Sequence, residues 1–340
     1  MSDVARQSGV SKNTVSLALR NDPQIPPATR KRIQTVAKRL GYCKNPIVGH
    51  LLAQLRAGFA TGHKATLALL NANADPEAFH RHPTIPTYVE GCLRRATAQG
   101  YGLDHFWLGD PRLNGERLNR ILSARNIRGA LVVGLMNQNR LPERFKATWE
   151  KVACVVTGVR TQDPALSFAC TDHHVLAIRA VENAIRLGYR RPGLVLDATI
   201  DKLIEGRFSA GFQVAQRQLA SRQRLAPFYD CPDVEGREQA FGRWLKEKRP
   251  DVLLTLYHAV RTWVEETGLS VPRDLGLIQL EWRADHRDWA GMNQHNDTVG
   301  EAAVDMLISM IHNGECGVPD APRATLIGST WMQGTTVQSV

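Results

Sequence analysis

Long apolar runs are missing from this sequence of 340 residues. A helix that crosses a bilayer needs roughly 18 to 20 consecutive apolar residues, and no such run occurs. The first residues also lack the apolar stretch that is typical of a secretory signal. We therefore expect neither membrane insertion nor secretion, and we predict a cytoplasmic protein.

Cysteine is scarce and scattered. The chain has six cysteines, and no two of them form a CxxC pair. They are Cys43, Cys92, Cys154, Cys170, Cys231 and Cys316. Several lie in apolar stretches, so we expect reduced core residues and neither a disulfide framework nor a zinc site. The pairs His80/His82 and His173/His174 have no completing ligand at metal spacing, so we expect surface residues there and no metal or other cofactor.

Signatures of common enzyme classes are also lacking. No phosphate loop of the Walker type is present, and no GxGxxG follows a predicted strand. The stretch Gly206–Gly211 approaches a nucleophile elbow but has one residue too many before Ser209. We therefore predict that the protein is not an enzyme.

Positive charge is concentrated at one end. Residues 1–57 contain four Lys and six Arg against only Asp3 and Asp22, so +8 of the net charge of +10 lies there. A near-neutral body with one basic end is typical of binding to the phosphate backbone of nucleic acid.

The same end has the pattern of a helix-turn-helix. A first helix buries Val4 and Ala5, Ser8-Gly9 supplies the turn, and a second helix begins after Ser11 and runs to Leu19. We expect Val15 and Leu19 to face the core. The outward positions of the second helix are those that reach base edges in the major groove, and they are held by Lys12, Asn13, Ser16 and Leu17. Phosphate contacts are expected from Ser11, Thr14, Asn21, Thr29 and Lys31.

A third helix follows Pro26-Pro27 and places Ile33, Val36, Ala37 and Leu40 on one face before Gly41. A short fourth helix is expected after Asn45. Its apolar residues include Val48, Leu51 and Leu52. One interpretation is a hinge helix that inserts Leu51 into the minor groove beside its twin from a second subunit. The other is that these residues pack only on the headpiece or the body.

These motifs together resemble the headpiece of the LacI/GalR family of bacterial transcription regulators. The resemblance lies in the run Asp3–Ser16, the Thr29-Arg30 pair, Leu40-Gly41-Tyr42 and Asn45 leading to Leu51. It implies a homodimer that reads a palindromic operator in double-stranded DNA, with Lys12, Asn13 and Leu17 at base-reading positions.

The body alternates apolar runs with amphipathic stretches. Strands are expected at 66–70, 102–108, 129–133, 153–157, 193–197, 252–256 and 275–280, and helices at 88–99, 113–125, 174–187, 202–220 and 235–248. This alternation predicts βαβ units in two doubly wound lobes, with a break near 157–167. A small molecule would then bind between the lobes, at the carboxyl ends of the strands.

The body resembles the core of the same family, which has the periplasmic sugar-binding fold. Matching stretches include Tyr88–Gly91, Asn126–Ala130, Val271–Gly276, Val299–Val304 and Trp331–Thr335. The match is loosest at the ligand positions, where Phe208, Tyr257-His258 and His295 replace the polar residues usual in sugar-responsive members. Residues at strand ends or crossovers that could still bind a polyol are Asn71, Asn73, Asp172, Arg207, Tyr257, His258, Glu281 and His295.

The predicted organisation is a headpiece at 1–44, a hinge helix and linker at 45–62 and a two-lobed core at 63–340. One lobe would comprise 63–158 and 290–322, and the other 159–289 and 323–340. The predicted function is a repressor that binds its operator as a homodimer under control of a small, sugar-like effector. Two alternatives stay open: a regulator that needs no ligand because its pocket is closed or vestigial, and a soluble ligand-binding module with a degenerate headpiece.

Overall fold

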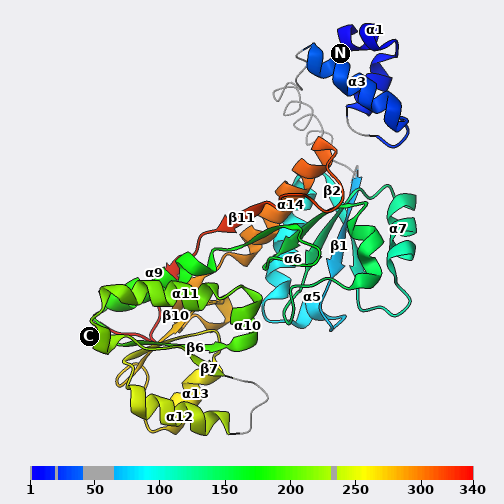
Figure 1. Cartoon of the computed structure of the whole chain (residues 1–340). Helices are drawn as coiled ribbons and strands as arrows, with labels where there is room; N and C mark the ends of the chain where they lie inside the picture. Colours follow the sequence, from blue (N-terminus) through cyan, green and yellow to red (C-terminus); the bar gives the residue numbers. More distant parts are fainter. Residues whose placement is uncertain (1, 20–21, 41–64, 231–235, 340) are drawn as a thin grey trace.

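The computed structural model describes residues 2–19, 22–40, 65–230 and 236–339. A bundle of helices forms one end of the molecule, and two α/β lobes follow it, one in the middle and one at the far end (Figure 1). The predicted architecture, a helical headpiece followed by two doubly wound lobes, is confirmed. The predicted hinge helix at 45–62 lies outside the described residues.

The headpiece consists of α1 (Ser2–Ser8), α2 (Lys12–Ala18) and α3 (Pro27–Arg39). Ser11 begins α2 as predicted, because its Oγ accepts a hydrogen bond from the Thr14 amide at 3.1 Å. The helices enclose a small core of Val4, Ala5, Val15, Ala18, Ile25, Ile33 and Ala37. Leu40, predicted to join this core, is instead 38% exposed, because α3 ends at the residue before it.

The first lobe, here the N-lobe, is built on a parallel sheet with the order β11-β5-β4-β3-β1-β2. Its strands are β1 (Ala65–Asn71), β2 (Tyr101–Trp107), β3 (Gly129–Val133), β4 (Ala153–Thr157), β5 (Ser167–Thr171) and β11 (Ala324–Ile327). One face is covered by α6 (Ile85–Ala98) and α14 (Asn296–Asn313), and the other by α7 (Gly115–Ala124) and α8 (Lys146–Trp149). Burial on both faces explains why β3 and β4 are continuous apolar runs.

The second lobe, the C-lobe, has the order β12-β10-β9-β8-β6-β7, and only β12 runs antiparallel to its neighbour. Its strands are β6 (Pro192–Asp197), β7 (Phe228–Asp230), β8 (Val252–Thr255), β9 (Gly276–Gln279), β10 (Ala290–Asn293) and β12 (Thr330–Met332). Its helices are α9 (His173–Arg186), α10 (Ala198–Leu203), α11 (Arg207–Ala215), α12 (Arg237–Lys248) and α13 (Ala259–Glu266).

Short elements complete the two lobes. They are α5 (Ala78–Arg81) and single 3₁₀ turns at Glu143–Phe145, Gln216–Gln218, Ser221–Gln223 and Ala284–His286. The helix expected at 202–220 is divided into α10 and α11. Glu205 and Gly206 between them have φ angles of 60° and 71°, so the helix cannot continue through this point.

The chain crosses between the lobes after β5, after β10 and after β11. The predicted lobe boundaries therefore need correction. β5 completes the N-lobe sheet, so the first crossover lies at Asp172 and not between residues 157 and 167. β10 pairs with β9 in the C-lobe, and β11 pairs with β5 in the N-lobe, whereas the prediction assigned both to the opposite lobes.

Three of the cysteines, Cys92, Cys154 and Cys170, are buried free thiols, as predicted, and burial raises the pKa of each. Cys316 is exposed, whereas Cys43 and Cys231 lie outside the described residues. Among the helices that the structure describes, none is both long and apolar enough to cross a membrane.

Candidate functional site

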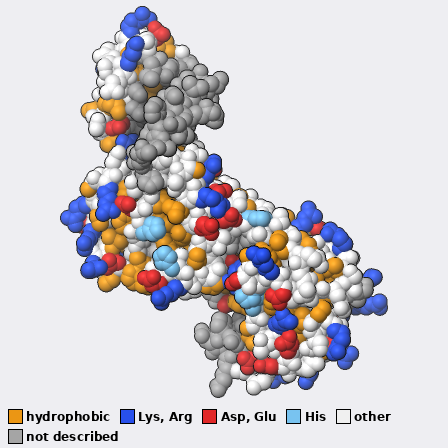
Figure 2. Space-filling view, turned by 180° about the vertical axis from the view of Figure 1, so that it is seen from behind, with side chains coloured by type: hydrophobic (Ala, Val, Ile, Leu, Met, Phe, Trp, Pro, Cys, Tyr) orange, Lys and Arg blue, Asp and Glu red, His pale blue; other side chains and the backbone are white. Residues whose placement is uncertain are grey.

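The first candidate site is the outer surface of the headpiece. Lys12 and Asn13 are exposed in the first turn of α2, and Lys31 is exposed on α3. Thr29 is half-buried, and the Thr14 hydroxyl lies 2.9 Å from that of Ser11. Figure 2 shows basic side chains at this end of the molecule. The exposed ones are Arg6, Lys12, Lys31, Arg32, Lys38 and Arg39.

Leu17 is less free than its outward position in the sequence suggests. It is half-buried and packs against the headpiece core, so only part of its side chain faces outward. The remaining residues predicted to contact DNA are Asn21, Val48, Leu51 and Leu52, which lie outside the described residues, and Ser16, whose side chain is not described. Their roles stay predictions.

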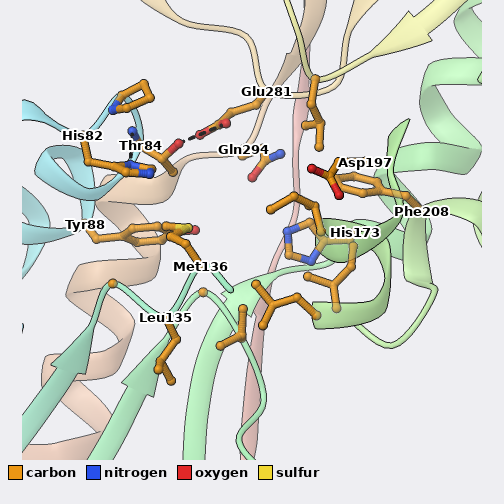
Figure 3. Close-up of a pocket in the computed structure, with 18 of the residues that line it drawn as sticks. His82, Thr84, Tyr88, Leu135, Met136, His173, Asp197, Phe208, Glu281 and Gln294 are labelled. Atoms are coloured by element: carbon orange, nitrogen blue, oxygen red, sulfur yellow. Dashed lines mark hydrogen bonds between the residues drawn. The ribbon is translucent and has the colours of Figure 1, made fainter. Parts of the chain in front are cut away.

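The second candidate site is a cavity of about 440 Å³ at the junction of the lobes. Its N-lobe wall includes His82, Thr84, Tyr88, Leu135 and Met136, and its C-lobe wall includes Asp197, Phe208, Tyr257, His258 and Glu281. His173 and Gln294, which lie at two of the crossovers, also line it (Figure 3). Segments that follow β3, β4, β6, β8 and β9 reach the cavity, as expected for ligand sites at the carboxyl ends of parallel strands.

Glu281 connects the lobes across this cavity. Its Oε2 accepts a hydrogen bond of 3.2 Å from the Thr84 hydroxyl of the N-lobe, drawn in Figure 3. Its Oε1 accepts one of 3.0 Å from the side-chain amide of Asn296, at the start of α14. Burial raises the pKa of Glu281, although these two bonds act in the opposite direction.

A cluster of nitrogen donors lies near Glu281. The guanidinium of Arg283 lies 3.2 Å from Nδ1 of His258, and the His258 ring stacks on that of His286 at 3.8 Å. Burial, together with the charges of His286 and Arg283, lowers the pKa of His258 to about 4. From the N-lobe, Nδ1 of His82 accepts hydrogen bonds from the amides of Thr84 and Ile85 at 3.1 and 3.3 Å.

His173 forms part of the cavity wall on the C-lobe side. Its ring lies edge-on to Phe208 with the centroids 5.0 Å apart, and the two are neighbours in Figure 3. Burial lowers the pKa of His173 to about 3, and the charge of Arg207 adds to this shift. The imidazole is therefore neutral at physiological pH. The sequence prediction placed His173 at the surface. This is wrong, because His173 is buried in the first turn of α9, which lies at the lobe junction.

Of the predicted effector residues, Tyr257, His258 and Glu281 line the cavity. The others lie outside its wall, and most of their side chains bind nearby groups. Asn71 donates to the carbonyls of Asp75 and Pro76, and Asn73 donates to that of Gly134.

Asp172 accepts from the Val175 amide at the start of α9, and His295 lies 2.9 Å from the Thr330 hydroxyl. Arg207 lines only a small neighbouring hollow behind His173.

Several lining residues were not predicted, among them His82, Thr84, Tyr88, Phe208 and Arg283. His82 and Thr84 precede a helix instead of following a strand. The expectation that ligand-binding residues follow the carboxyl ends of strands therefore does not include them. Arg283 lies two residues after Glu281, and extending the loop after β9 would have included it.

No described group of His, Cys, Asp and Glu side chains is arranged to hold a metal ion. The site consists of hydrogen-bonding and apolar groups around a cavity, which suits reversible binding of a small organic molecule.

Comparisons with known proteins identify both kinds of domain. Residues 1–45 match the bacterial regulatory proteins of the lacI family, and residues 181–337 match the periplasmic binding protein-like domain. The transcriptional regulator CelR of Thermobifida fusca is 24% identical over 338 residues, covering 93% of this chain and 92% of CelR. The regulator GalR of Escherichia coli K12 is 23% identical over 291 residues, covering 82% of this chain and 78% of GalR.

Solved structures share the fold. A complex of the regulator CelR with cellobiose has a TM-score of 0.59 at 18% identity and covers 98% of both chains. The lac repressor dimer bound to operator and anti-inducer has a TM-score of 0.58 at 17% identity and covers 98% of this chain and 97% of its own. The matched relatives are transcriptional regulators and not enzymes. With a lacI-type helix-turn-helix at one end and a periplasmic-binding-protein-like core behind it, this chain belongs to the LacI/GalR family of DNA-binding transcriptional regulators.

Proposed function

We propose that the protein is a homodimeric repressor that binds a palindromic operator, and that a small molecule in the interlobe cavity sets its operator affinity. The observation that carries this proposal is the cavity of about 440 Å³, which is lined from both lobes in a chain that begins with a DNA-binding headpiece. A ligand that touches both lobes can favour one lobe arrangement over another. The cellobiose bound in the CelR structure supports an effector of roughly sugar size.

The headpiece would act through two kinds of contact. Lys12 and Asn13, exposed at the start of α2, suit base edges in the major groove, and Leu17 has a partly exposed apolar surface for a thymine methyl. Ser11, Thr14, Thr29 and Lys31 suit phosphate oxygens, which fix the position of the headpiece without reading sequence. Leu51 would act as the minor-groove wedge of the hinge segment.

Control by the effector would be a shift between two arrangements of the lobes. Effector binding would change the lobe angle, and with it the separation of the two hinge segments in the dimer. The ligand can move this equilibrium only by its difference in affinity for the two arrangements. The open volume of the cavity favours this mechanism over a regulator with a closed or vestigial pocket.

The DNA-binding part of the proposal is tested by fluorescence anisotropy with a palindromic fragment from the DNA beside the gene. Lys31→Ala should weaken binding to every fragment and reduce the slope of log affinity against log salt by about one. Lys12→Ala should instead relax the preference among operator variants, with a cost of about 1–3 kcal/mol for the preferred site.

Lys146→Ala is the control, because Lys146 is an exposed residue of the N-lobe, far along the chain from the headpiece. Binding without sequence preference or salt dependence in the wild type would refute the proposal. It would favour a ligand-binding module with a degenerate headpiece.

A further inference from the structure

We infer that the effector is an organic anion with an apolar body, of the aryl or alkyl carboxylate class, and not a sugar. This inference rests on the proposed function and deepens it. It follows from the unequal supply of hydrogen-bond donors and acceptors in the cavity wall, and from the apolar surface beside them.

The donors are grouped around Arg283. The charge of this guanidinium acts to lower the pKa of the Glu281 and Asp285 carboxyls. No ion pair or hydrogen bond joins the guanidinium to a carboxylate of the described residues, however, and its Nε is buried without an acceptor. A partly buried cation without a directly bound carboxylate is unfavourable, since desolvation penalises the charge. A ligand carboxylate would supply the partner and could bind the guanidinium with two parallel hydrogen bonds.

Two histidines extend this donor group. Arg283 can only donate, so Nδ1 of His258 accepts, and the proton of the neutral ring lies on Nε2. That Nε2 is buried and has no acceptor among the described residues. Nδ1 of His82 likewise accepts from two backbone amides, which leaves its proton on Nε2. All three side chains line the cavity, and the charge of Arg283 lowers the pKa of both histidines.

The two carboxylates in the wall are held by groups of the protein itself. Both oxygens of Glu281 accept hydrogen bonds, from Thr84 and Asn296. Asp197 accepts from the Thr199 amide at the start of α10, and Figure 3 places it beside Phe208, across the cavity from His82. A sugar hydroxyl both donates and accepts, whereas the unpartnered Nε of Arg283 and Nε2 of His258 only donate. A carboxylate only accepts, which matches the donor group.

The rest of the wall is apolar. Leu135 and Met136 follow β3, Val159 follows β4, and Ile204 and Phe208 belong to the region of α10 and α11. The neutral His173 packs edge-on against Phe208 and adds no charge. Such a surface suits an aromatic ring or an alkyl chain, whereas the many hydroxyl groups of a sugar would lose their hydration against it.

The test is a ligand panel on the full-length protein. It contains 3-phenylpropionate, 2-naphthoate and octanoate, each with its uncharged amide, and cellobiose as the sugar. Thermal unfolding identifies compounds that stabilise the protein, and calorimetry gives their dissociation constants. We expect at least one carboxylate to bind, and its amide to bind at least about ten-fold more weakly.

Variants then assign the carboxylate to Arg283. Arg283→Gln should weaken carboxylate binding by about ten-fold or more and leave amide binding unchanged, whereas Arg283→Lys, which keeps the charge, should recover part of the affinity. Arg287→Gln is the matched control, because Arg287 is exposed in the same segment and does not line the cavity.

The inference is overturned if amides bind as well as acids, if Arg283→Gln and Arg287→Gln behave alike, or if no carboxylate binds. Binding of cellobiose alone would overturn it and leave the proposed function intact. Operator binding is measured separately, so failure of the regulator proposal is distinguishable from failure of the ligand class.

Discussion

His173 occupies an unusual place for a titratable side chain, because it is buried at the lobe junction with a neutral ring. Its pKa of about 3 in the folded protein lies below the ordinary value of 6.5. Between these two pH values the His173 ring is therefore protonated in the unfolded chain and not in the folded chain. The contribution of the buried neutral ring to the free energy of unfolding is fully present above pH 6.5 and decreases as the pH falls toward 3.

Replacing His173 by Phe should remove this pH dependence. Between about pH 7.5 and about pH 5, the free energy of unfolding of the wild type should fall by about 2 kcal/mol relative to that of the variant. Urea unfolding at these two pH values measures the difference. His80→Gln, at an exposed position on α5, is the control and should follow the wild type. A His173→Phe curve parallel to that of the wild type would contradict a buried neutral ring.

Strand ends account for the site residues that could be predicted from the sequence. Tyr257, His258 and Glu281 each come shortly after a buried apolar run, and all three line the cavity. Asn71 and Asn73 satisfy the same rule, but their amides bond to nearby backbone carbonyls instead. The sequence indicates which residues follow a strand. Whether their side chains bond to the loop backbone or to a ligand depends on the geometry of the loop.

At the scale of elements, the contact between α6 and α14 holds the N-lobe together. The two helices approach closely because glycines face the partner backbone. A Cβ on Gly300 would overlap the carbonyl oxygen of Tyr88, and one on Gly91 would overlap that of Asp297. Since these atoms belong to helix backbones, neither can move aside without separating the helices.

Gly300→Ala should therefore destabilise the protein by about 1–3 kcal/mol or more, although alanine is the better helix former. Gly242→Ala on α12 is the matched control, because its Cβ would meet only the Thr267 methyl group, at 3.7 Å. That control should be neutral or more stable by about 0.5–1 kcal/mol. Thermal unfolding compares the two variants. Equal melting temperatures would show that the helices separate without cost.

Strands made of continuous apolar residues were predictable, and strands with interrupted or little-buried sequences were not. β3 and β4 are fully buried, and their bounds coincide with the predicted ones. β11 alternates between exposed and half-buried residues, and β12 is only three residues long, so neither produces an apolar run. The crossovers follow β5, β10 and β11, and β5 and β10, although buried, contain polar residues or glycine that interrupt an apolar run. This explains why the fold class was predicted correctly and the lobe boundaries were not.

At the scale of the whole molecule, the hydrogen bond from Thr84 to Glu281 joins the lobes directly through the cavity wall. Thr84→Val removes this bond with little change in shape. A hydrogen bond contributes about 0.5–1.5 kcal/mol, so the lobe arrangement seen here should become about 2- to 10-fold less populated. Apparent affinity for whichever panel compound binds the wild type should fall by the same factor, because only that arrangement contacts it from both lobes.

Operator binding supplies the second half of this experiment. If the compound changes operator affinity by some factor, the operator must change compound affinity by the same factor, because the two equilibria are linked. Thr84→Val should shift operator affinity measured without the compound, whereas Thr97→Val, exposed on the same helix α6, should not. Fluorescence anisotropy with and without a saturating concentration of the compound gives the operator affinity in each condition. A Thr84→Val protein with wild-type affinity for compound and operator would mean that this bond does not contribute to the lobe equilibrium.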